Sequence, residues 1–425
     1  MKQSGIDWIG EIPDDWKTRQ IRYLFSLRDE RNYKPLSEVN LISVYTDKGV
    51  LQHSDIEQTT GNKAQNADGY KHVYKNDLVV NIILCWMGAL GISDFDGVTS
   101  PAYDVYAPKD LNTILPKYYH YLFRTPQFNG KCYTEGRGIM QMRWRTYSSE
   151  FKSIKVPLPP KATQQRIAEY LDSKCAQIDS IIEESKKSIE EYKTWKQSVI
   201  FEAVTGKNIN CKKKDSGIEW IGEIPAEWEV RKIRTIANII RGGSPRPIDE
   251  FMTNSESGFN WIKIGDTVKG SKYITSTKTK IIKEGLSKTR IVNPGDLILT
   301  NSMSFGEPYI LKINGCIHDG WVAFSQIIKS VNKEFLYYFL RSSFCNTQFQ
   351  LQVDGGVVQN LNIDKIKSTT LFLPPLPEQE SIAKMLDSKC AQIDSLIAEK
   401  ESLIADLTEY KKSLIFEVVT GKRSV

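Results

Sequence analysis

A ten-residue sequence that occurs twice constrains this chain more than any other feature. LDSKCAQIDS starts at Leu171 and again at Leu386, 215 positions later. A second repeated block opens each half, as SGIDWIGEIP from Ser4 and as SGIEWIGEIP from Ser216. Internal repeats take precedence over other sequence signals because they define the structural units. The chain is therefore a tandem duplication whose halves share some parts and differ in others.

The repeated segments carry a helical heptad pattern. From Ala168 and again from Ala383, mostly apolar residues recur at steps of three and four over about five heptads, which is enough to predict a coiled coil. About 40 helical residues, at roughly 1.5 Å each, give a rod of about 60 Å. We predict that the helix–helix seam contains Leu171, Cys175, Ile178, Ile182 and Ile189 in the first copy and Leu386, Cys390, Ile393, Ile397 and Ile404 in the second.

Prolines and glycines indicate where these helices begin and end. Prolines up to Pro160 in the first copy and up to Pro377 in the second block any earlier helical start. Gly206 and Gly421 stand where a C-terminal glycine is expected. A narrow apolar stripe needs a partner helix, and the second copy supplies one within the chain. Dimerisation between chains is the alternative, and the stripe does not choose between parallel and antiparallel pairing.

The segments between the repeats have the pattern of mixed α/β domains. Strand-like runs at 75–84 and 293–302 follow turn signals, and Tyr-rich amphipathic stretches at 116–125 and 332–343 are typical of core-facing helices. A chain of 425 residues is also too long for one ordinary core. We predict an α+β fold with a first globular domain at 1–155, a first long helix at 156–210, a second globular domain at 211–370 and a second long helix at 371–425.

Signatures of catalysis and metal binding are missing from the sequence. The four histidines show no metal-ligand spacing, the seven cysteines form no CxxC pair, and no phosphate loop, HExxH or GxSxG motif occurs. No apolar run approaches the roughly 20 residues that span a bilayer, and the N-terminal sequence lacks the apolar core of a signal peptide. We therefore expect no catalytic residue, no metal, no cofactor and a cytoplasmic location.

Cationic and amide side chains gather in loops of the two divergent segments. Arg can fork onto guanine edges or phosphates, and Asn or Gln can pair with adenine. The net charge of +6 is compatible with a nucleic-acid partner. We predict that the nucleic-acid-binding residues are Asn81, Trp86, Arg137, Gln141, Arg143 and Arg145 in the first domain and Arg241, Arg246, Lys263, Asn301, Ser302, Ser304, His318, Gln359 and Asn360 in the second.

Further motifs accompany the repeats. LPPKATQQRIAEYLD from Leu158 corresponds to LPPLPEQESIAKMLD from Leu373, both heptad helices end in VTGK, and both halves begin with WIGEIP and a Trp three residues later. WIKIGD from Trp261 and NPGDLILT from Asn293 complete the set. With these motifs, the chain resembles over essentially its whole length the DNA specificity subunit of type I restriction-modification systems. The first copy departs slightly, with Ala-Thr-Gln-Gln in place of Pro-Glu-Gln-Glu.

This resemblance implies two mixed α/β target recognition domains joined by two long helices, which pair as a pseudo-twofold symmetric antiparallel coiled coil. Each domain would read one half of a bipartite double-stranded DNA target. The helices would space the domains and dock two methyltransferase subunits, a translocase/nuclease subunit would join them, and the chain itself would be non-catalytic.

Two other functions stay open from the sequence. The first is a coiled-coil protein–protein adaptor without DNA binding, which predicts no salt-dependent DNA affinity. The second is a self-sufficient methyltransferase or nuclease, which predicts that the purified chain alone modifies or cuts DNA.

Overall fold

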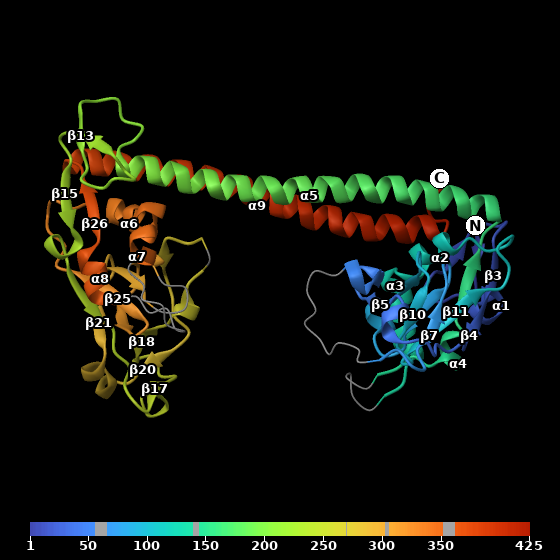
Figure 1. Cartoon of the computed structure of the whole chain (residues 1–425). Helices are drawn as coiled ribbons and strands as arrows, with labels where there is room; N and C mark the ends of the chain where they lie inside the picture. The colour runs from blue at the N-terminus through green and yellow to red at the C-terminus, as the bar shows by residue number, and fades with distance from the viewer. Residues whose placement is uncertain (56–65, 139–143, 269, 302–305, 352–361) are drawn as a thin grey trace. The chain divides into compact units, whose positions relative to one another are not determined.

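The described residues form two compact units. The computed structural model describes residues 1–55, 66–138, 144–268, 270–301, 306–351 and 362–425 (Figure 1). The first unit comprises Met1–Lys186 with Glu401–Val425, and the second comprises Lys187–Lys400. Each unit therefore holds one mixed α/β domain and a part of each long helix.

The two long helices are α5 (Lys161–Thr205) and α9 (Leu376–Val419). As predicted, α5 begins directly after Pro160, and Gly206 follows its last residue with a φ of +67°. The expectation that Pro377 blocks an earlier start is wrong, because α9 begins one residue before it. A proline in the first turn removes no helical hydrogen bond, since the N–H groups there have no partner within the helix.

The helices pair antiparallel within each unit. In the first unit, Leu171 near the start of α5 shares a hydrophobic cluster with Leu414 near the end of α9. In the second unit, Ile200 near the end of α5 shares a cluster with Leu386 near the start of α9. Figure 1 shows the α5 and α9 ribbons beside each other in both units. The antiparallel coiled coil is therefore confirmed within each unit.

An ion pair recurs at the same place of both helix pairs. Lys411 Nζ lies 2.6 Å from a carboxylate oxygen of Asp179 in the first unit. Lys196 Nζ lies 2.6 Å from a carboxylate oxygen of Asp394 in the second. Each aspartate is the ninth residue of the repeated decapeptide. The same position of the repeat thus binds the opposite helix in both units.

The domain of the first unit is built on an antiparallel sheet of order β4-β11-β8-β9. Helices α2 and α3 place aromatic side chains such as Phe123 and Phe128 in the core with the sheet residues Leu78 and Tyr106. The strands are β1 (Lys2–Gln3), β2 (Glu11–Ile12), β3 (Lys17–Gln20), β4 (Phe25–Arg28), β5 (Ile42–Tyr45), β6 (Gly49–Gln52), β7 (Lys71–Val73), β8 (Leu78–Asn81), β9 (Leu90–Ile92), β10 (Gly97–Thr99), β11 (Tyr103–Pro108) and β12 (Lys155–Leu158), and the short helices are α1 (Ile21–Leu24), α2 (Pro116–Phe123), α3 (Pro126–Glu135) and α4 (Ser148–Phe151).

The domain of the second unit repeats this frame, with β16-β25-β22-β23 in the same antiparallel order and β19 added parallel to β23. Its strands are β13 (Lys213–Asp215), β14 (Glu223–Pro225), β15 (Glu229–Lys232), β16 (Asn238–Arg241), β17 (Met252–Thr253), β18 (Phe259–Ile262), β19 (Tyr273–Ile274), β20 (Lys280–Ile281), β21 (Arg290–Val292), β22 (Leu297–Thr300), β23 (Pro308–Leu311), β24 (Gly315–Ile317), β25 (Trp321–Ser325) and β26 (Thr370–Leu373), and its short helices are α6 (Lys333–Arg341), α7 (Ser343–Leu351) and α8 (Ile363–Ser368).

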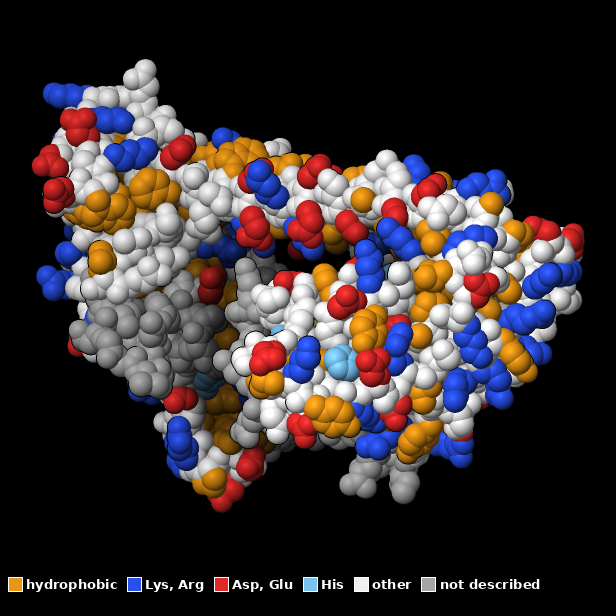
Figure 2. Space-filling model, turned by 45° about the vertical axis from the view of Figure 1, so that its right-hand side comes forward, with side chains coloured by type: hydrophobic (Ala, Val, Ile, Leu, Met, Phe, Trp, Pro, Cys, Tyr) orange, Lys and Arg blue, Asp and Glu red, His pale blue; other side chains and the backbone are white. Residues whose placement is uncertain are grey.

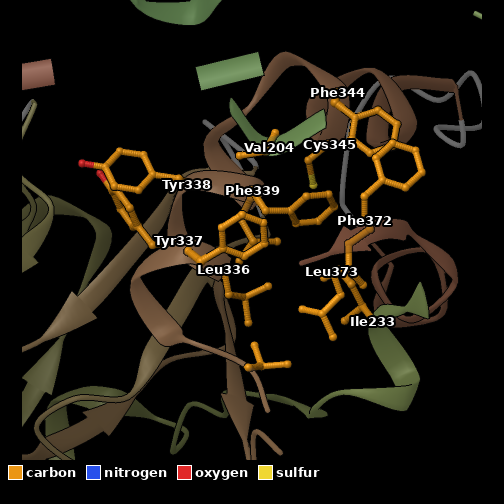
Figure 3. Packing of buried hydrophobic residues seen from close by; sticks show 14 of the residues in the cluster. Val204, Ile233, Leu336, Tyr337, Tyr338, Phe339, Phe344, Cys345, Phe372 and Leu373 are labelled. Carbon is orange, nitrogen blue, oxygen red and sulfur yellow. The ribbon is translucent and has the colours of Figure 1, made fainter. Parts of the chain in front are cut away.

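The core of the second unit joins the domain to the helices. Figure 3 shows Val204, from the last turn of α5, among domain residues such as Phe339 of α6. Phe344 of α7 stacks on Phe372 of β26 with ring centroids 4.9 Å apart. The predicted strands at 75–84 and 293–302 and the predicted helices at 116–125 and 332–343 are confirmed as β8, β22, α2 and α6.

A buried glutamine fastens each domain to the start of its long helix. Gln164 Oε1 accepts a hydrogen bond from Leu115 N at 2.8 Å, and its Nε2 donates to two backbone carbonyls. Gln379 makes the same three bonds in the second unit, with Asn332 N donating at 2.8 Å. This arrangement explains the glutamine in both LPP-containing motifs.

The first aspartate of the repeated decapeptide is also bound by its domain in both units. The Tyr121 hydroxyl donates to Asp172 Oδ1 at 2.8 Å, and the Tyr338 hydroxyl donates to Asp387 Oδ1 at 2.5 Å. Both tyrosines come from the Tyr-rich helices that the sequence predicts. The decapeptide therefore contacts its own domain through one aspartate and the opposite helix through the other.

Each WIGEIP block packs against the C-terminal end of a long helix. The first block contacts the end of α9, and the second contacts the end of α5. Each block contains the second strand of a short hairpin, β1–β2 or β13–β14, and the end of the turn before it. A Cβ on Gly421, whose φ is +72°, would lie 2.4 Å from Pro13 Cδ, and one on Gly206 would lie 2.4 Å from Pro225 Cδ. Both the left-handed backbone and this close approach require glycine. The VTGK ending and the WIGEIP opening are thus two sides of one contact.

Candidate nucleic-acid interface

A tight turn between β24 and β25 organises the polar residues of the second unit. The backbone oxygen of Asp319 accepts hydrogen bonds from Arg241 Nε at 3.0 Å and from Asn301 Nδ2 at 3.2 Å. Its carboxylate accepts from Ser244 Oγ at 2.5 Å, and this hydrogen bond is the largest cause that lowers the pKa of Asp319. The turn therefore fixes two residues that the sequence predicts as DNA-binding, Arg241 and Asn301.

The loop after β16 approaches this turn so closely that it needs glycine. A Cβ on Gly242 would lie 2.0 Å from the backbone oxygen of His318, and one on Gly243 would lie 2.6 Å from that of Lys288. The next residues turn back, and Arg246 Nη2 lies 3.8 Å from the Asp319 carboxylate. The Arg-Gly-Gly-Ser-Pro sequence is thus a structural turn that carries Arg246 to the Asp319 side.

Arg246, Lys263 and His318 line one cavity of about 680 Å³. These three predicted residues come from a loop, from the end of β18 and from the β24–β25 turn. Burial lowers the pKa of His318, so its imidazole is neutral near pH 7. The structure therefore brings together five predicted residues of this domain around one turn, while Ser302, Ser304, Gln359 and Asn360 lie outside the described residues.

Two predicted residues of the first unit hold the backbone after β8. Asn81 is buried, and its Oδ1 accepts a hydrogen bond from Ile83 N at 3.1 Å. Trp86 Nε1 donates to Ile83 O at 2.9 Å, and its ring lies 5.4 Å from that of Tyr133. These contacts are structural, and the assignment of both side chains to DNA contact stays a prediction.

The two described arginines of the first unit form the base of a loop. The backbones of Arg137 and Arg145 exchange two hydrogen bonds of 2.9 Å, and both side chains are exposed. The Arg137 guanidinium pairs with Glu150. No carboxylate lies within ion-pair distance of Arg145 among the residues that the structure describes. Arg145 is therefore available at the base of the loop, and Gln141 and Arg143 lie outside the described residues.

Trp144 fixes the base of this loop to α3. Its ring stacks on Tyr133 at 5.0 Å, and its Nε1 donates to Tyr133 O at 3.0 Å. A Cβ on Gly136 would lie 2.3 Å from Trp144 Nε1, so the glycine makes room for the indole. Sequence reasoning missed the central role of Asp319. The Asp-Gly pair between the apolar segments 316–317 and 321–324 is a turn signal that could have indicated Asp319.

The described residues also bear on metal sites and membrane spans. In the part of the chain that the structure describes, no group of three or more His, Cys, Asp or Glu side chains could hold a metal ion. Likewise, none of the helices in the described ranges is long and apolar enough to cross a membrane. On the face drawn in Figure 2, Lys and Arg side chains lie among Asp and Glu side chains along the helices.

Comparison with known proteins gives consistent relatives. The chain is 25% identical over 443 residues to a putative type I restriction enzyme MjaX specificity subunit of Methanocaldococcus jannaschii, which covers 97% of this chain and 95% of that protein. It is 27% identical over 427 residues to the MjaVIII specificity subunit of the same organism, covering 97% and 93%. The chain is thus similar along its whole length to proteins named specificity subunits.

Solved structures show the same fold. A chain from work on complex assembly and conformational transition of the type I R-M system aligns with a TM-score of 0.76 at 14% identity, covering 97% of this chain and 100% of that one. The HsdS subunit from Thermoanaerobacter tengcongensis aligns with a TM-score of 0.58 at 15% identity, covering 97% and 98%.

A family match covers most of the chain and falls in both halves. The type I restriction modification DNA specificity domain matches residues 13–191 and again 225–404. Each match contains one domain and most of the long helix that follows it. The chain therefore belongs to the family of type I restriction modification DNA specificity domains, of which it carries two.

Proposed function

We propose that this chain is the non-catalytic specificity subunit of a type I restriction-modification complex and reads a bipartite double-stranded DNA target. The observation that carries the proposal is the contrast within each unit. The sheet frame and the joints to the helices are the same in both units, whereas the polar loops differ. One chain that must present two different reading surfaces on equivalent frames needs this combination.

The reading surfaces are assigned to the loops described above. In the first unit we assign base or phosphate contact to Arg145, because its side chain is exposed and has no carboxylate partner among the described residues. In the second unit we assign it to Arg241, Arg246 and Lys263, which converge around the Asp319 turn. Arginine forks onto guanine or phosphate, and lysine positions phosphates.

The first test identifies the target and then perturbs one half of it. Sequencing of methylated genomic DNA from cells that carry this chain and its partner subunits identifies the target. Arg145→Ala should then weaken binding by about 1–3 kcal/mol if the arginine contacts a base, through the first half-site only. Arg19→Ala, an exposed arginine on β3 of the same unit, is the control and should bind normally. Equal dependence on both half-sites after Arg145→Ala would contradict the assignment.

A salt titration separates this proposal from a protein–protein adaptor. A DNA reader that neutralises several phosphates loses affinity steeply with salt, because bound counterions are released. We expect the logarithm of the affinity to fall linearly with the logarithm of the salt concentration. An adaptor would show no such DNA affinity at any salt concentration, and methyl transfer by the chain alone would instead support an enzyme.

We also propose where two methyltransferase subunits dock. Ile181 and Tyr410 of the first unit are 43% and 47% exposed, and Trp195 and Leu396 of the second are 51% and 36% exposed. Each pair flanks the ion pair of its own helix pair, since Asp179 and Lys411 or Lys196 and Asp394 are one or two residues away. Exposed aliphatic and aromatic side chains that cluster on a surface are typical of a contact with another protein.

The duplication sets the expected stoichiometry. Ile181 corresponds to Leu396, and Trp195 corresponds to Tyr410, at the same spacing as the repeated decapeptide. Each unit thus offers one aliphatic and one aromatic side chain, as two copies of the same partner would require. Apolar side chains reach the surface along the helices in Figure 2.

The docking test removes one surface at a time. The double variant Ile181→Glu with Tyr410→Glu should reduce the bound methyltransferase subunits from two to one in native mass spectrometry. The double variant Trp195→Glu with Leu396→Glu should do the same. Lys187→Glu, an exposed residue of the same helix, is the control and should leave two bound. Retention of two subunits by either double variant would contradict this surface.

We further propose that a translocase/nuclease subunit completes the complex. The whole complex would act on DNA in the cytoplasm.

A further inference from the structure

The cavity in the second unit has the composition of a site for a small ligand. Its walls combine apolar side chains, namely Pro245, Pro247, Ile248 and Trp261, with polar ones, namely Ser244, Arg246, Lys263 and His318. Its volume of about 680 Å³ lies within the range of about 300–1,000 Å³ that is typical of ligand pockets. A mainly apolar wall with a few polar groups is the usual lining of such pockets.

His318 presents a hydrogen-bond donor at this cavity. Its Nδ1 accepts a hydrogen bond from Gly320 N at 2.8 Å, so the proton of the neutral ring is on Nε2. Within the described residues, Nε2 has no hydrogen-bond partner. The imidazole lies beside the indole of Trp261, with ring centroids 6.1 Å apart. Trp261 is only 2% exposed, so a ligand in the cavity would meet a fixed N–H donor beside a small part of the indole.

The charge of the lining favours an anion. Lys263 has no carboxylate within ion-pair distance among the residues described, and Arg246 is 83% exposed with its nearest carboxylate oxygen 3.8 Å away. That carboxylate, on Asp319, already accepts a hydrogen bond from Ser244 Oγ. Two cations with weak internal compensation raise the local concentration of negatively charged ligands.

The first unit has different residues at the corresponding positions. The turn between β10 and β11 reads Ser100-Pro101-Ala102, where the turn between β24 and β25 reads His318-Asp319-Gly320. The imidazole and the carboxylate of the second turn are therefore replaced by a hydroxyl and a proline in the first. Any ligand selected by these groups is selected by the second unit alone.

We propose that this cavity is a subsite for one nucleotide. Its base lies against Pro247 and Ile248 and accepts a hydrogen bond from His318 Nε2, and its phosphate binds Lys263 and Arg246. The nucleotide is either one residue of bound DNA turned out of the base stack or a free mononucleotide. The first source rests on the function proposed above, and the second does not.

The first arm of the test uses free nucleotides and the full chain. Calorimetric titration with each of the four deoxynucleoside monophosphates should show that one binds more tightly than inorganic phosphate or deoxyribose 5-phosphate. Lys263→Ala should weaken this binding about ten-fold, since a hydrogen bond to a charged group is lost. His318→Phe should remove the preference among bases. Lys278→Ala, an exposed lysine of the same domain, is the control and should bind as the unaltered chain does.

The second arm uses duplex DNA that contains the identified target. 2-Aminopurine replaces each base of the second half-site in turn, and its fluorescence rises when it leaves the stack. We expect a rise at one position, which His318→Phe abolishes while circular dichroism confirms that the variant is folded. A response in this arm alone identifies DNA as the source, and a response in the first arm alone identifies a free nucleotide.

The outcomes also separate this subsite from the general function. If neither arm responds, or if inorganic phosphate binds as tightly as every nucleotide and no 2-aminopurine position changes, the subsite is overturned. Salt-dependent binding of the target would still hold in that case, and the proposed function would stand. Loss of all DNA affinity, with free nucleotide still bound, would leave the subsite and overturn the DNA reader.

Discussion

The two units share their joints and differ at their turns. In both, a buried glutamine, a tyrosine–aspartate hydrogen bond and a lysine–aspartate ion pair connect the domain and the two helices. The turn before the central strand differs, as Ser100–Ala102 in one unit and His318–Gly320 in the other. Sequence identity in this chain therefore follows the internal contacts that both units must make, and divergence follows the surface each unit presents.

This comparison changes what the exact repeat means. Identical helices suggest a surface that two identical partners recognise. The structure supplies an internal reason for much of the identity, because Leu171, Asp172, Cys175, Ile178 and Asp179 all contact the domain or the opposite helix. The exposed residues proposed for docking lie outside the repeated ten and are similar rather than identical. Folding thus explains these five identities, whereas the other five residues of the repeat, Ser173, Lys174, Ala176, Gln177 and Ser180, are exposed.

The largest expected effect tests whether the two seams are equivalent. Ile178→Asp and Ile393→Asp each bury a carboxylate in an apolar contact and should lower the free energy of unfolding by at least about 3 kcal/mol. Urea denaturation measures the loss, and hydrogen exchange of peptides from each unit locates it. Ile178→Val and Ile393→Val are controls and should cost less than about 1.5 kcal/mol. A large loss at only one of the two positions would show that the seams are not equivalent. We also expect each variant to lose methyltransferase docking together with the helix pairing.

The next effect is a difference between the units in their response to pH. Burial lowers the pKa of His120 to about 4, while the corresponding residue before the second aspartate-binding tyrosine is Tyr337. A histidine whose pKa is lowered in the folded state costs no stability above its unfolded pKa of about 6.5. It destabilises the folded state as the pH falls below that value. We expect the first unit to lose up to about 3 kcal/mol as the pH falls from about 6.5 to 4.

His120→Gln isolates this effect. The variant should flatten the pH dependence of the first unit and leave that of the second unchanged, as followed by urea denaturation at each pH with hydrogen exchange. Burial also lowers the pKa of His318, so the second unit should lose stability in the same direction as the pH falls. An unchanged pH profile of the first unit in His120→Gln would show that this histidine is not the cause.

A smaller, symmetric effect is expected at the glutamine joints. Gln164→Ala and Gln379→Ala each leave one backbone N–H and two carbonyls without their side-chain partner, which should cost about 2–3 kcal/mol in each unit. Urea denaturation measures both. Gln165→Ala changes the exposed neighbour of Gln164 and should cost almost nothing. Unequal losses would show that the two glutamines contribute differently to the free energy of unfolding despite their equivalent hydrogen bonds.

The smallest effect distinguishes the joints. Trp228 Nε1 donates to Glu378 Oε2 at 3.1 Å, whereas Thr163 occupies the corresponding position in the first copy. Trp228→Phe should therefore cost about 1 kcal/mol more than Trp16→Phe, because a hydrogen bond is lost only in the second unit. Glu378→Thr should remove this difference. Equal costs for the two tryptophan variants in urea denaturation would argue against a contribution from this bond.

Local patterns predicted the helices and strands well. The heptad stripe and its flanking Pro160 and Gly206 define α5 to the residue, because proline and glycine act on the backbone next to them. The start of α9 was missed by one residue, since a proline in the first turn is tolerated. Patterns with a period and a local stop signal are therefore readable without tertiary contacts.

Contacts between distant residues were not readable. The WIGEIP blocks show no periodicity that indicates their partner. Pro13 contacts Gly421 although the two residues lie near opposite ends of the sequence. The hub role of Asp319 depends on Arg241, Ser244 and Asn301, which three separate loops deliver. The place of Asn81 at the end of a strand suggests an exposed side chain, although that side chain is buried. Residue type locates polar loops, and only the fold shows which side chains remain at the surface.

The division of the units also sets an order in which the chain can be finished as it is made. The second unit is one continuous stretch, 187–400, whereas the first also needs residues 401–425. Leu414 and Val418 complete the hydrophobic cluster of the first unit, and Val419 accepts the hydrogen bond of Tyr118. Domains usually mature from the N-terminus during synthesis. Here the first unit cannot complete its core until the last turns of α9 have left the ribosome. The second unit, although most of it is translated later, can therefore complete its core first.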